Sequence, residues 1–519
     1  MQLHKIALAD THSFSSFFLD YISQKDSLKK FYHRFPLIEN FKGQIQEKIS
    51  FPQSNRDVLF KSLTQQYEGI KITEAVASNL NSLKDSKTFT VTTGHQLNIF
   101  TGPLYFIYKI VTVINACKKL KAHNPEYSFV PVYWMASEDH DYEEIKWFRL
   151  YGKKYGWETD QTGAVGRFNP KGLSKLIDEL PGEVSVFKNA YSKSKTLAQA
   201  TRQYVNDLFG SEGLIVVDGD DRDLKSLFKN VIHDDLFNHT PKKLVEEKNK
   251  QLEELHYHPQ VFARDINFFY LDKNIRQRVE KNGDSYTVVD TDIKFSSGEI
   301  KNLVDTFPEK FSPNVVLRPL YQETILPNLA YVGGPAEVVY WLQLKSVFDH
   351  FKTPFPILMP RNFAAVMDEP IKKKFEKTGL ELRDFFKEKN SLFNHWITRN
   401  SRNNLSLEKE IKEARNIFTN VREHAAQIDS TLLKHADAQT LRLTKSLEVI
   451  EQKMLRAEKR KQDDKLRQIE VVKDFLFPNG SPQERTDNFL NFYQQDQQFI
   501  QKLIQNIDPF DFQFNVIDL

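Results

Sequence analysis

Short apolar runs that recur along the first 380 residues constrain the fold of this chain more than any other feature. The first run, KTFTVTTG, alternates and is rich in Thr, Val and Phe, whereas the later runs show little alternation. Stretches with helical spacing separate them. This order is typical of parallel strands that helices cover on both faces. The runs occupy residues 87–94, 128–137, 212–223, 314–320, 329–335 and 355–362.

The loops that follow these runs hold glycine and polar residues, and open α/β sheets bind ligands at the carboxyl ends of their strands. We therefore predict a Rossmann-like α/β core over residues 1–380, with insertions at roughly 151–205 and 240–310. Within this core, residues 1–86 are predicted to be helical with polar breaks.

The C-terminal part of the chain carries heptad patterns, which predict a coiled coil. The first seam consists of Ile411, Ala414, Phe418, Val421, Ala425, Ile428 and Leu432. The second consists of Leu443, Leu447, Ile450, Met454 and Ala457, and the pattern resumes out of register at Leu466 and Ile469. Two long helices joined near residues 434–440 would form an antiparallel hairpin, and a third helix is predicted over 484–507. We assign residues 381–510 to a coiled-coil domain and 511–519 to a C-terminal tail.

Composition narrows the class of protein. The 519 residues include 72 Lys and Arg and 69 Asp and Glu, and this balance argues against a nucleic-acid partner. A single cysteine, Cys117, excludes an intramolecular disulfide framework and a multi-cysteine zinc site. The N-terminus has no signal-peptide pattern, and no apolar stretch is long enough to span a membrane. We expect a cytoplasmic protein without a membrane partner.

The loop after the first run, in VTTGHQLNIFTGPLYFIYK, is a candidate anion site. It matches neither the P-loop nor the dinucleotide fingerprint, and Gly94 and Gly102 are eight residues apart. The amides at the start of the next helix could bind an anion, and Thr101 could cap that helix or contact a phosphate. His95 and Gln96 lie at the strand end, where side chains face the crevice. A capped turn with a buried histidine is an equally good interpretation.

An acidic cluster, SEDHDYEEI, follows the second run. Glu138, Asp139, His140 and Asp141 could hold a divalent ion or act as acid and base. Carboxylates also favour helix starts, which accounts for Asp141 but less well for Glu138 and Asp139. The cluster lacks H-E-x-x-H and a cysteine partner, so no metal site is predicted.

Two further strand ends carry polar residues. Arg318 is predicted to follow a strand, and Gly333 and Gly334 precede a helix with Glu337 in its first turn. A glycine pair lets a ligand approach the backbone closely, although Glu337 could also serve only the helix dipole.

The last run ends in MPRN, where Arg361 suits a carboxylate or phosphate and Asn362 follows it. The histidines of HYHP are predicted to be structural, and Cys117 to be a small buried residue.

Taken together, these blocks resemble a known family. VTTGHQLNIFTGPLYFIYKI, VPVYWMASEDHDYEEI, LRPLYQETILPNLAYVGGPAEVVYWLQLK, PILMPRN and FLFPNGSPQER, in this order, resemble BshC, the cysteine ligase of bacillithiol synthesis. The resemblance runs nearly end to end. It implies a Rossmann-like core with connecting-peptide insertions, a C-terminal coiled coil and a homodimer.

The resemblance also implies a reaction, the joining of cysteine to the amine of glucosaminyl-malate, which gives bacillithiol or a related thiol. The family's loop more often reads TGQQ than TGHQ, so His95 is not expected to be an essential base. The loop also lacks the H-x-G-H signature of class I adenylating enzymes, which leaves open whether adenylation occurs. Amide formation needs an activated carboxyl, for which ATP or another nucleotide would serve.

The predicted site divides into two roles. Carboxylates would bind the amine or act as base, and backbone amides and arginines would hold anionic groups. The catalytic candidates are Glu138, Asp139 and Asp141. The substrate-binding candidates are Gly94, His95, Gln96, Thr101, Gly102, His140, Arg318, Gly333, Gly334, Glu337, Arg361 and Asn362. Two alternatives stay open: a nucleotide-dependent transferase with another amine acceptor, and a catalytically inactive coiled-coil scaffold.

Overall fold

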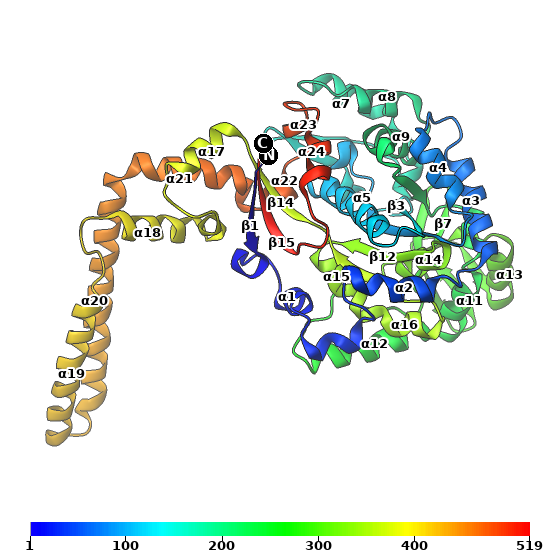
Figure 1. Cartoon of the computed structure of the whole chain (residues 1–519). Coiled ribbons are helices and arrows are strands. Elements are labelled where there is room, and N and C mark those ends of the chain that lie inside the picture. The colour runs from blue at the N-terminus through cyan, green and yellow to red at the C-terminus, as the bar shows by residue number, and fades with distance from the viewer. Residues whose placement is uncertain (1) are drawn as a thin grey trace.

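The computed structural model describes residues 2–519 and has a five-stranded parallel sheet at its centre (Figure 1). The sheet confirms the predicted parallel α/β core. Almost every residue of its strands is buried, as expected for a sheet covered on both faces. In spatial order the strands are β13 (Ile357–Pro360), β12 (Asn328–Gly333), β2 (Thr88–His95), β3 (Ser128–Met135) and β6 (Ile215–Asp218).

Helices connect the strands and cover the sheet. The longest helix between two strands of this sheet, α5 (Tyr105–His123), links β2 to β3 and is buried along most of its length. Among residues 2–519, no helix combines the length and apolar character needed to cross a membrane. The other core helices are α1 (Ser16–Ile22), α2 (Phe41–Lys48), α3 (Gln53–Gln66), α4 (Glu74–Ser82), α6 (Tyr142–Ile145), α10 (Arg222–Ser226), α11 (Lys229–Asn238), α14 (Arg318–Ile325), α15 (Pro335–Trp341) and α16 (Lys345–His350).

The predicted strand at residues 314–320 is wrong. Strand β11 (Phe311–Pro313) ends before this segment, and the chain then turns into α14, which begins at Arg318. The Asn314 side chain accepts the backbone N–H of Val316, and Pro319 occupies the first turn of the helix. Proline there has the backbone angle that a helix start requires, so these local signals override the apolar composition.

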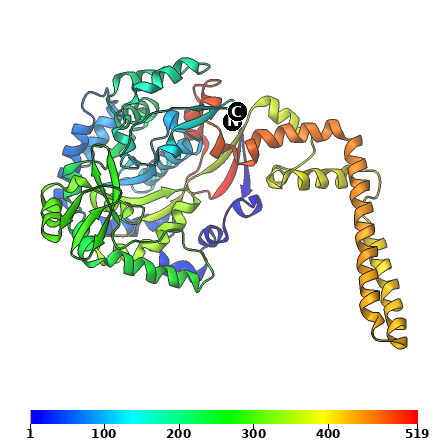
Figure 2. The same cartoon turned by 180° about the vertical axis from the view of Figure 1, so that it is seen from behind.

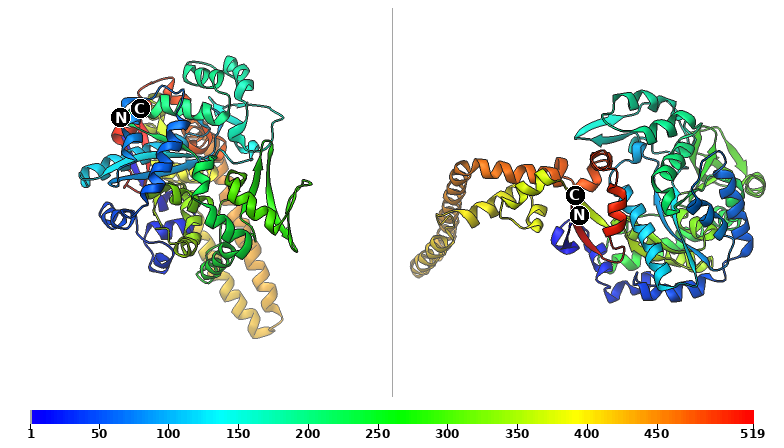
Figure 3. Two further views of the ribbon diagram at one scale, coloured as in Figure 1. Left: turned by 90° about the vertical axis from the view of Figure 1, so that its right-hand side faces the viewer. Right: turned by 45° about the horizontal axis from the view of Figure 1, so that its top comes forward.

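The two predicted insertions contain elements of their own. The first includes the hairpin β4 (Trp147–Leu150) and β5 (Lys153–Gly156), followed by α7 (Leu173–Glu179), α8 (Ser185–Lys193) and α9 (Leu197–Phe209). The second includes α12 (Thr240–Glu253), β7 (Phe268–Asp272), β8 (Ile275–Asn282), β9 (Ser285–Val288), β10 (Lys294–Ser296) and α13 (Ser297–Thr306). Strands β7 to β10 and β11 (Phe311–Pro313) form an antiparallel sheet beside the core (Figure 3).

A third sheet brings the two ends of the chain together. Strand β15 (Gln513–Asp518) lies between β1 (Gln2–Ala7) and β14 (Phe363–Met367), antiparallel to the first and parallel to the second. The termini are therefore adjacent in Figure 1. The prediction that residues 1–86 are helical with polar breaks is wrong for β1, which pairs with β15, a strand far away in the sequence.

The coiled-coil hairpin is confirmed, with a different turn. Helices α19 (Glu408–Ile428) and α20 (Leu432–Lys461) pack on each other and project away from the core, as both faces of the molecule show (Figures 1 and 2). The predicted junction at 434–440 is wrong, because α19 ends at Ile428. The next residue, Asp429, is extended, and its side chain accepts the backbone N–H of Thr431.

The hairpin connects to the core through α17 (Glu369–Glu376), α18 (Lys389–Asn400) and α21 (Asp463–Leu476). The break at Gln462 explains why the second heptad series resumes out of register. The predicted helix over 484–507 is wrong as a single element. It consists of three short helices, α22 (Gln483–Thr486), α23 (Leu490–Tyr493) and α24 (Phe499–Asn506).

Candidate active site

A cavity of 920 Å³ opens at the carboxyl ends of β2, β3, β12 and β13. Open α/β sheets bind their ligands at this edge. The loops after these four strands converge on it, together with the start of α14. Of the predicted site residues, the cavity is lined by Gly94, His95, Gln96, Glu138, Asp139, His140, Arg318, Gly334, Glu337 and Arg361.

Five predicted residues do not line the cavity: Thr101, Gly102, Asp141, Gly333 and Asn362. Asp141 is exposed just before α6, and Asn362 donates to the carbonyl of Asp508. The prediction that Thr101 caps a helix is wrong, because α5 begins after Leu104 without a side-chain cap.

Glu337 holds the strand ends together at one side of the cavity. Its carboxylate lies 2.5 Å from the Lys109 ammonium and accepts the Tyr331 hydroxyl and the Gly334 amide, each at 2.7 Å. Lys109 also donates to the carbonyl of Gly94 at 2.8 Å. Burial favours the neutral acid, but Lys109 outweighs it and holds the pKa of Glu337 below its usual value. Glu337 is thus an anion with a positioning role.

The two predicted arginines differ in whether they are free to bind a ligand. Arg361 makes a bidentate ion pair with Glu484, at 2.8 and 2.6 Å. Arg318 lies over the rings of Tyr331 and Trp341 and donates one N–H to Gln322 at 3.1 Å. Its Nη2 atom is buried and has no hydrogen-bond partner within residues 2–519. Arg318 is therefore the better candidate to bind an anionic group of a ligand.

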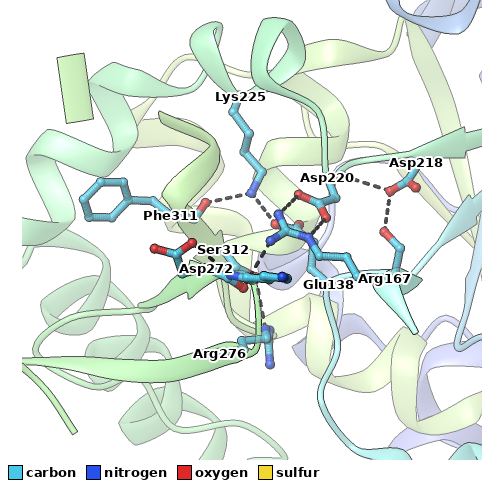
Figure 4. A network of polar contacts seen from close by, with 11 residues as sticks. Glu138, Arg167, Asp218, Asp220, Lys225, Asp272, Arg276, Phe311 and Ser312 are labelled. Atoms are coloured by element: carbon cyan, nitrogen blue, oxygen red, sulfur yellow. Dashed lines mark hydrogen bonds and ion pairs between the residues drawn. The ribbon is translucent and has the colours of Figure 1, made fainter. Parts of the chain in front are cut away.

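The opposite side of the cavity carries the acidic loop after β3, whose polar contacts Figure 4 shows. Glu138 forms an ion pair with the buried Lys225, which also donates to the carbonyl of Phe311 at 2.7 Å. Burial raises the pKa of Glu138, and Lys225 offsets only part of this effect. A carboxylate with a raised pKa at a cavity wall is suited to take up a proton from a ligand.

Asp139 and His140 are held beside Glu138. The Asp139 carboxylate accepts the Gln96 amide at 2.9 Å. Arg276, from β8, donates to Nδ1 of His140 at 2.5 Å. Burial and Arg276 lower the pKa of His140, so its ring is neutral with the proton on Nε2. These contacts join the acidic loop to the antiparallel sheet of the second insertion.

A network of hydrogen bonds and ion pairs holds the acidic loop in place (Figure 4). Ser137 donates a hydrogen bond to Asp218 at the end of β6. Arg167 donates two hydrogen bonds, of 2.7 and 2.8 Å, to the carboxylate of Asp220. Burial and Asp220 raise the pKa of Asp218 to about 6. Throughout residues 2–519, no three His, Cys, Asp or Glu side chains are grouped so that they could hold a metal ion.

His95 is half-buried and contacts the rings of Tyr105 and Phe106. Burial, with a smaller effect of Lys109, lowers the pKa of His95 to about 3. The ring is neutral at physiological pH, and its Nε2 has no partner among the residues described. His95 can therefore supply a hydrogen bond but is poorly suited to act as a base.

Four cationic residues of the cavity wall were not predicted: Lys109, Arg264, Arg276 and Arg485. Lys109 had a local signal, since it is the one charged residue in the apolar stretch YFIYKIVTVINAC. Arg276 had no local sequence signal, because it reaches the cavity only when the second insertion packs on the core. Arg485 lies in FLFPNGSPQER, a block that contributed to the family resemblance without a role of its own.

Comparisons with known proteins identify the family. A family model described as bacillithiol biosynthesis BshC, N-terminal Rossmann-like domain, matches residues 1–362. The corresponding C-terminal coiled-coil domain matches residues 364–519. The chain belongs to the BshC family. Relatives from Cytophaga hutchinsonii and Flavobacterium johnsoniae, each named "Putative cysteine ligase BshC", are 41% and 42% identical to it, with 98% of both chains covered.

In this BshC-family chain, a strained turn links β2 to α5. Phe100 and Thr101 have positive φ angles of 52° and 70°, which cost free energy for residues with side chains. Gly102 follows with φ 63°, and a Cβ there would lie 2.6 Å from Asn98. The buried Asn488 stabilises the turn by donating to the carbonyls of Phe100 and Gly102, both at 2.7 Å.

We expect Asn488→Ala to loosen this turn. Two carbonyls would lose their donor, which should destabilise the fold by about 2 kcal/mol or more. The midpoint of urea unfolding should fall, and hydrogen exchange of the peptide covering 96–108 should quicken. Gln497→Ala, at an exposed position, is the control and should change stability by less than about 0.5 kcal/mol. Equal behaviour of the two variants would contradict the assigned role of Asn488.

Proposed function

We propose that this chain is a ligase that joins the carboxyl group of cysteine to the amine of glucosaminyl-malate, the last step in the synthesis of bacillithiol or a related thiol. The supporting observation is a cavity with an acidic side and a cationic side at the strand ends of a chain that matches the BshC family over its whole length. Its 920 Å³ is in the range of small-molecule sites.

In the proposed reaction, the cysteine carboxyl is first activated as a phosphate or adenylate by ATP or another nucleotide. The amine of glucosaminyl-malate then attacks the activated carbonyl carbon, and the phosphate or nucleotide leaves with the bonding electron pair. Glu138 takes the proton from the attacking nitrogen, while Asp139 and Gln96 orient it. Arg318 binds an anionic group and stabilises the charge that develops on the leaving group.

Purified protein tests this proposal directly. With cysteine, ATP and glucosaminyl-malate, we expect a product whose mass equals the two substrates minus one water, with consumption of ATP. Each substrate should also raise the thermal midpoint, because a ligand that binds only the folded state stabilises it. Product formed only with a different amine would favour the alternative transferase. No product and no thermal response at millimolar ligand would favour an inactive scaffold.

The pH dependence tests Glu138 as the base. Since the pKa of Glu138 is raised, ligation should slow as the pH falls through that value and protonates the carboxylate. Glu138→Gln should reduce kcat by at least about 100-fold, the usual contribution of a general base. His95→Gln should leave the acidic limb of the pH–rate profile unchanged, because the pKa of His95 is about 3. Thermal unfolding should show that both variants are folded. If the acidic limb of the pH–rate profile is unchanged in Glu138→Gln, another residue is the base.

We also propose that the chain forms a homodimer through its coiled-coil hairpin. Helix α19 has no buried residue in the single chain. Ile417, Val421 and Ile428 form a stripe on it, with 61%, 46% and 81% of each residue exposed. Contiguous apolar surface of this kind usually marks a protein interface.

The dimer proposal predicts a change of mass. Light scattering after size exclusion should give twice the chain mass of 60.7 kDa. The double change Ile417→Glu and Val421→Glu should give monomers, because it places charges in the apolar contact. Thr419→Glu, on the opposite face of α19, is the control and should remain dimeric. A double variant that stays dimeric would place the interface elsewhere.

A further inference from the structure

We propose that Arg485 is an anion-binding residue of this cavity, and that it is supplied by the C-terminal domain to hold a carboxylate or phosphate group of a substrate. The inference rests on the proposed function for the identity of that substrate. Arg485 is the only residue of the region 364–519 among the described residues that line the cavity.

The residues on both sides of Arg485 are fixed to the core. Gln483 makes two hydrogen bonds to the backbone of Val366, at 2.8 and 3.0 Å. Glu484 forms the buried ion pair with Arg361. Asn488 holds the turn before α5. Arg485 therefore extends from a short segment whose position is determined by contacts on both sides.

Arg485 itself has no such contact. Its side chain is exposed at the cavity wall, and no carboxylate within residues 2–519 lies within 4.0 Å of it. Its neighbour Glu484 instead points to the core and pairs with Arg361. An unpaired guanidinium on a backbone segment that is held in place at a cavity wall can bind an oxyanion through a bidentate fork.

Few cationic residues of the cavity are free to bind an anionic group of a substrate. Lys109 is paired with Glu337, Arg361 with Glu484, and Arg276 contacts His140 and lies 3.7 Å from Asp139. Arg264, Arg318 and Arg485 line the cavity without an ion pair to any residue of 2–519. Arg485 differs from the other two because its segment also fixes Arg361 and the turn that leads into α5.

The carboxylates of glucosaminyl-malate, the carboxylate of cysteine and the phosphates of ATP share this chemistry, and binding measurements separate them. We would titrate the full-length protein calorimetrically with each of the three compounds. Arg485→Gln should weaken at least one of them by about 10-fold or more, which corresponds to the loss of a charge-assisted pair. The weakened compound identifies the source of the anion.

Two further variants sharpen this test. Arg485→Lys keeps the charge but loses the fork, so its affinity should lie between those of the wild type and Arg485→Gln. Arg467→Gln removes an exposed arginine of α21 that does not line the cavity, and should bind as the wild type does. Thermal midpoints should show that all three variants are folded.

The result separates the inference from the proposed function. If the wild type ligates and Arg485→Gln binds every compound as Arg467→Gln does, the inference is wrong and the function stands. If anion binding depends on Arg485 but no ligation occurs with any of the substrates, the function is wrong and the inference stands. A wild type that binds none of the three compounds overturns both.

Discussion

The buried ion pair between Arg361 and Glu484 joins the two domains of this BshC-family chain at its functional edge. Only 2% and 4% of the two side chains are exposed, so neither could stay charged in place without the other. Arg361 follows β13, and Glu484 lies in α22. Their contact fixes the C-terminal segment against the strand ends. The cavity is consequently a property of both domains, although the parallel sheet belongs to the first alone.

Pairing of charges divides the cavity into two chemical environments. On the cationic side, Lys109 and Glu337 neutralise each other and tie the strand ends together, which leaves Arg318 unpaired. On the acidic side, burial keeps the pKa of Glu138 raised although Lys225 is adjacent. A carboxylate that can take up a proton therefore faces the same space as a guanidinium that can bind an anion. Amide-forming chemistry on charged substrates requires both.

Local sequence patterns predicted the parts of the site that lie in the loops directly after the strands. The loops at Gly94 and Glu138 follow apolar strands, and the topology of a parallel sheet brings such loops to one edge. The segment at Arg318 is apolar like a strand, but Pro319 favours a helix start there and a helix forms. Arg276 could not be predicted, since its contact with His140 joins residues 136 positions apart. The pair that positions Arg485 spans 123 positions, which no local pattern encodes.

The sheet that unites the chain ends has a consequence for synthesis. Strand β15 comprises residues 513–518 of 519, and it supplies the only ladder that connects β1 with β14 among the residues described. Strand β1 is therefore synthesised long before its partner β15, and this sheet can close only after β15 has left the ribosome. Until then, β1 and β14 have free edges that can pair with other chains. Strand β1 thus has to wait for β15, and a chain without β15 would expose the edges of both β1 and β14.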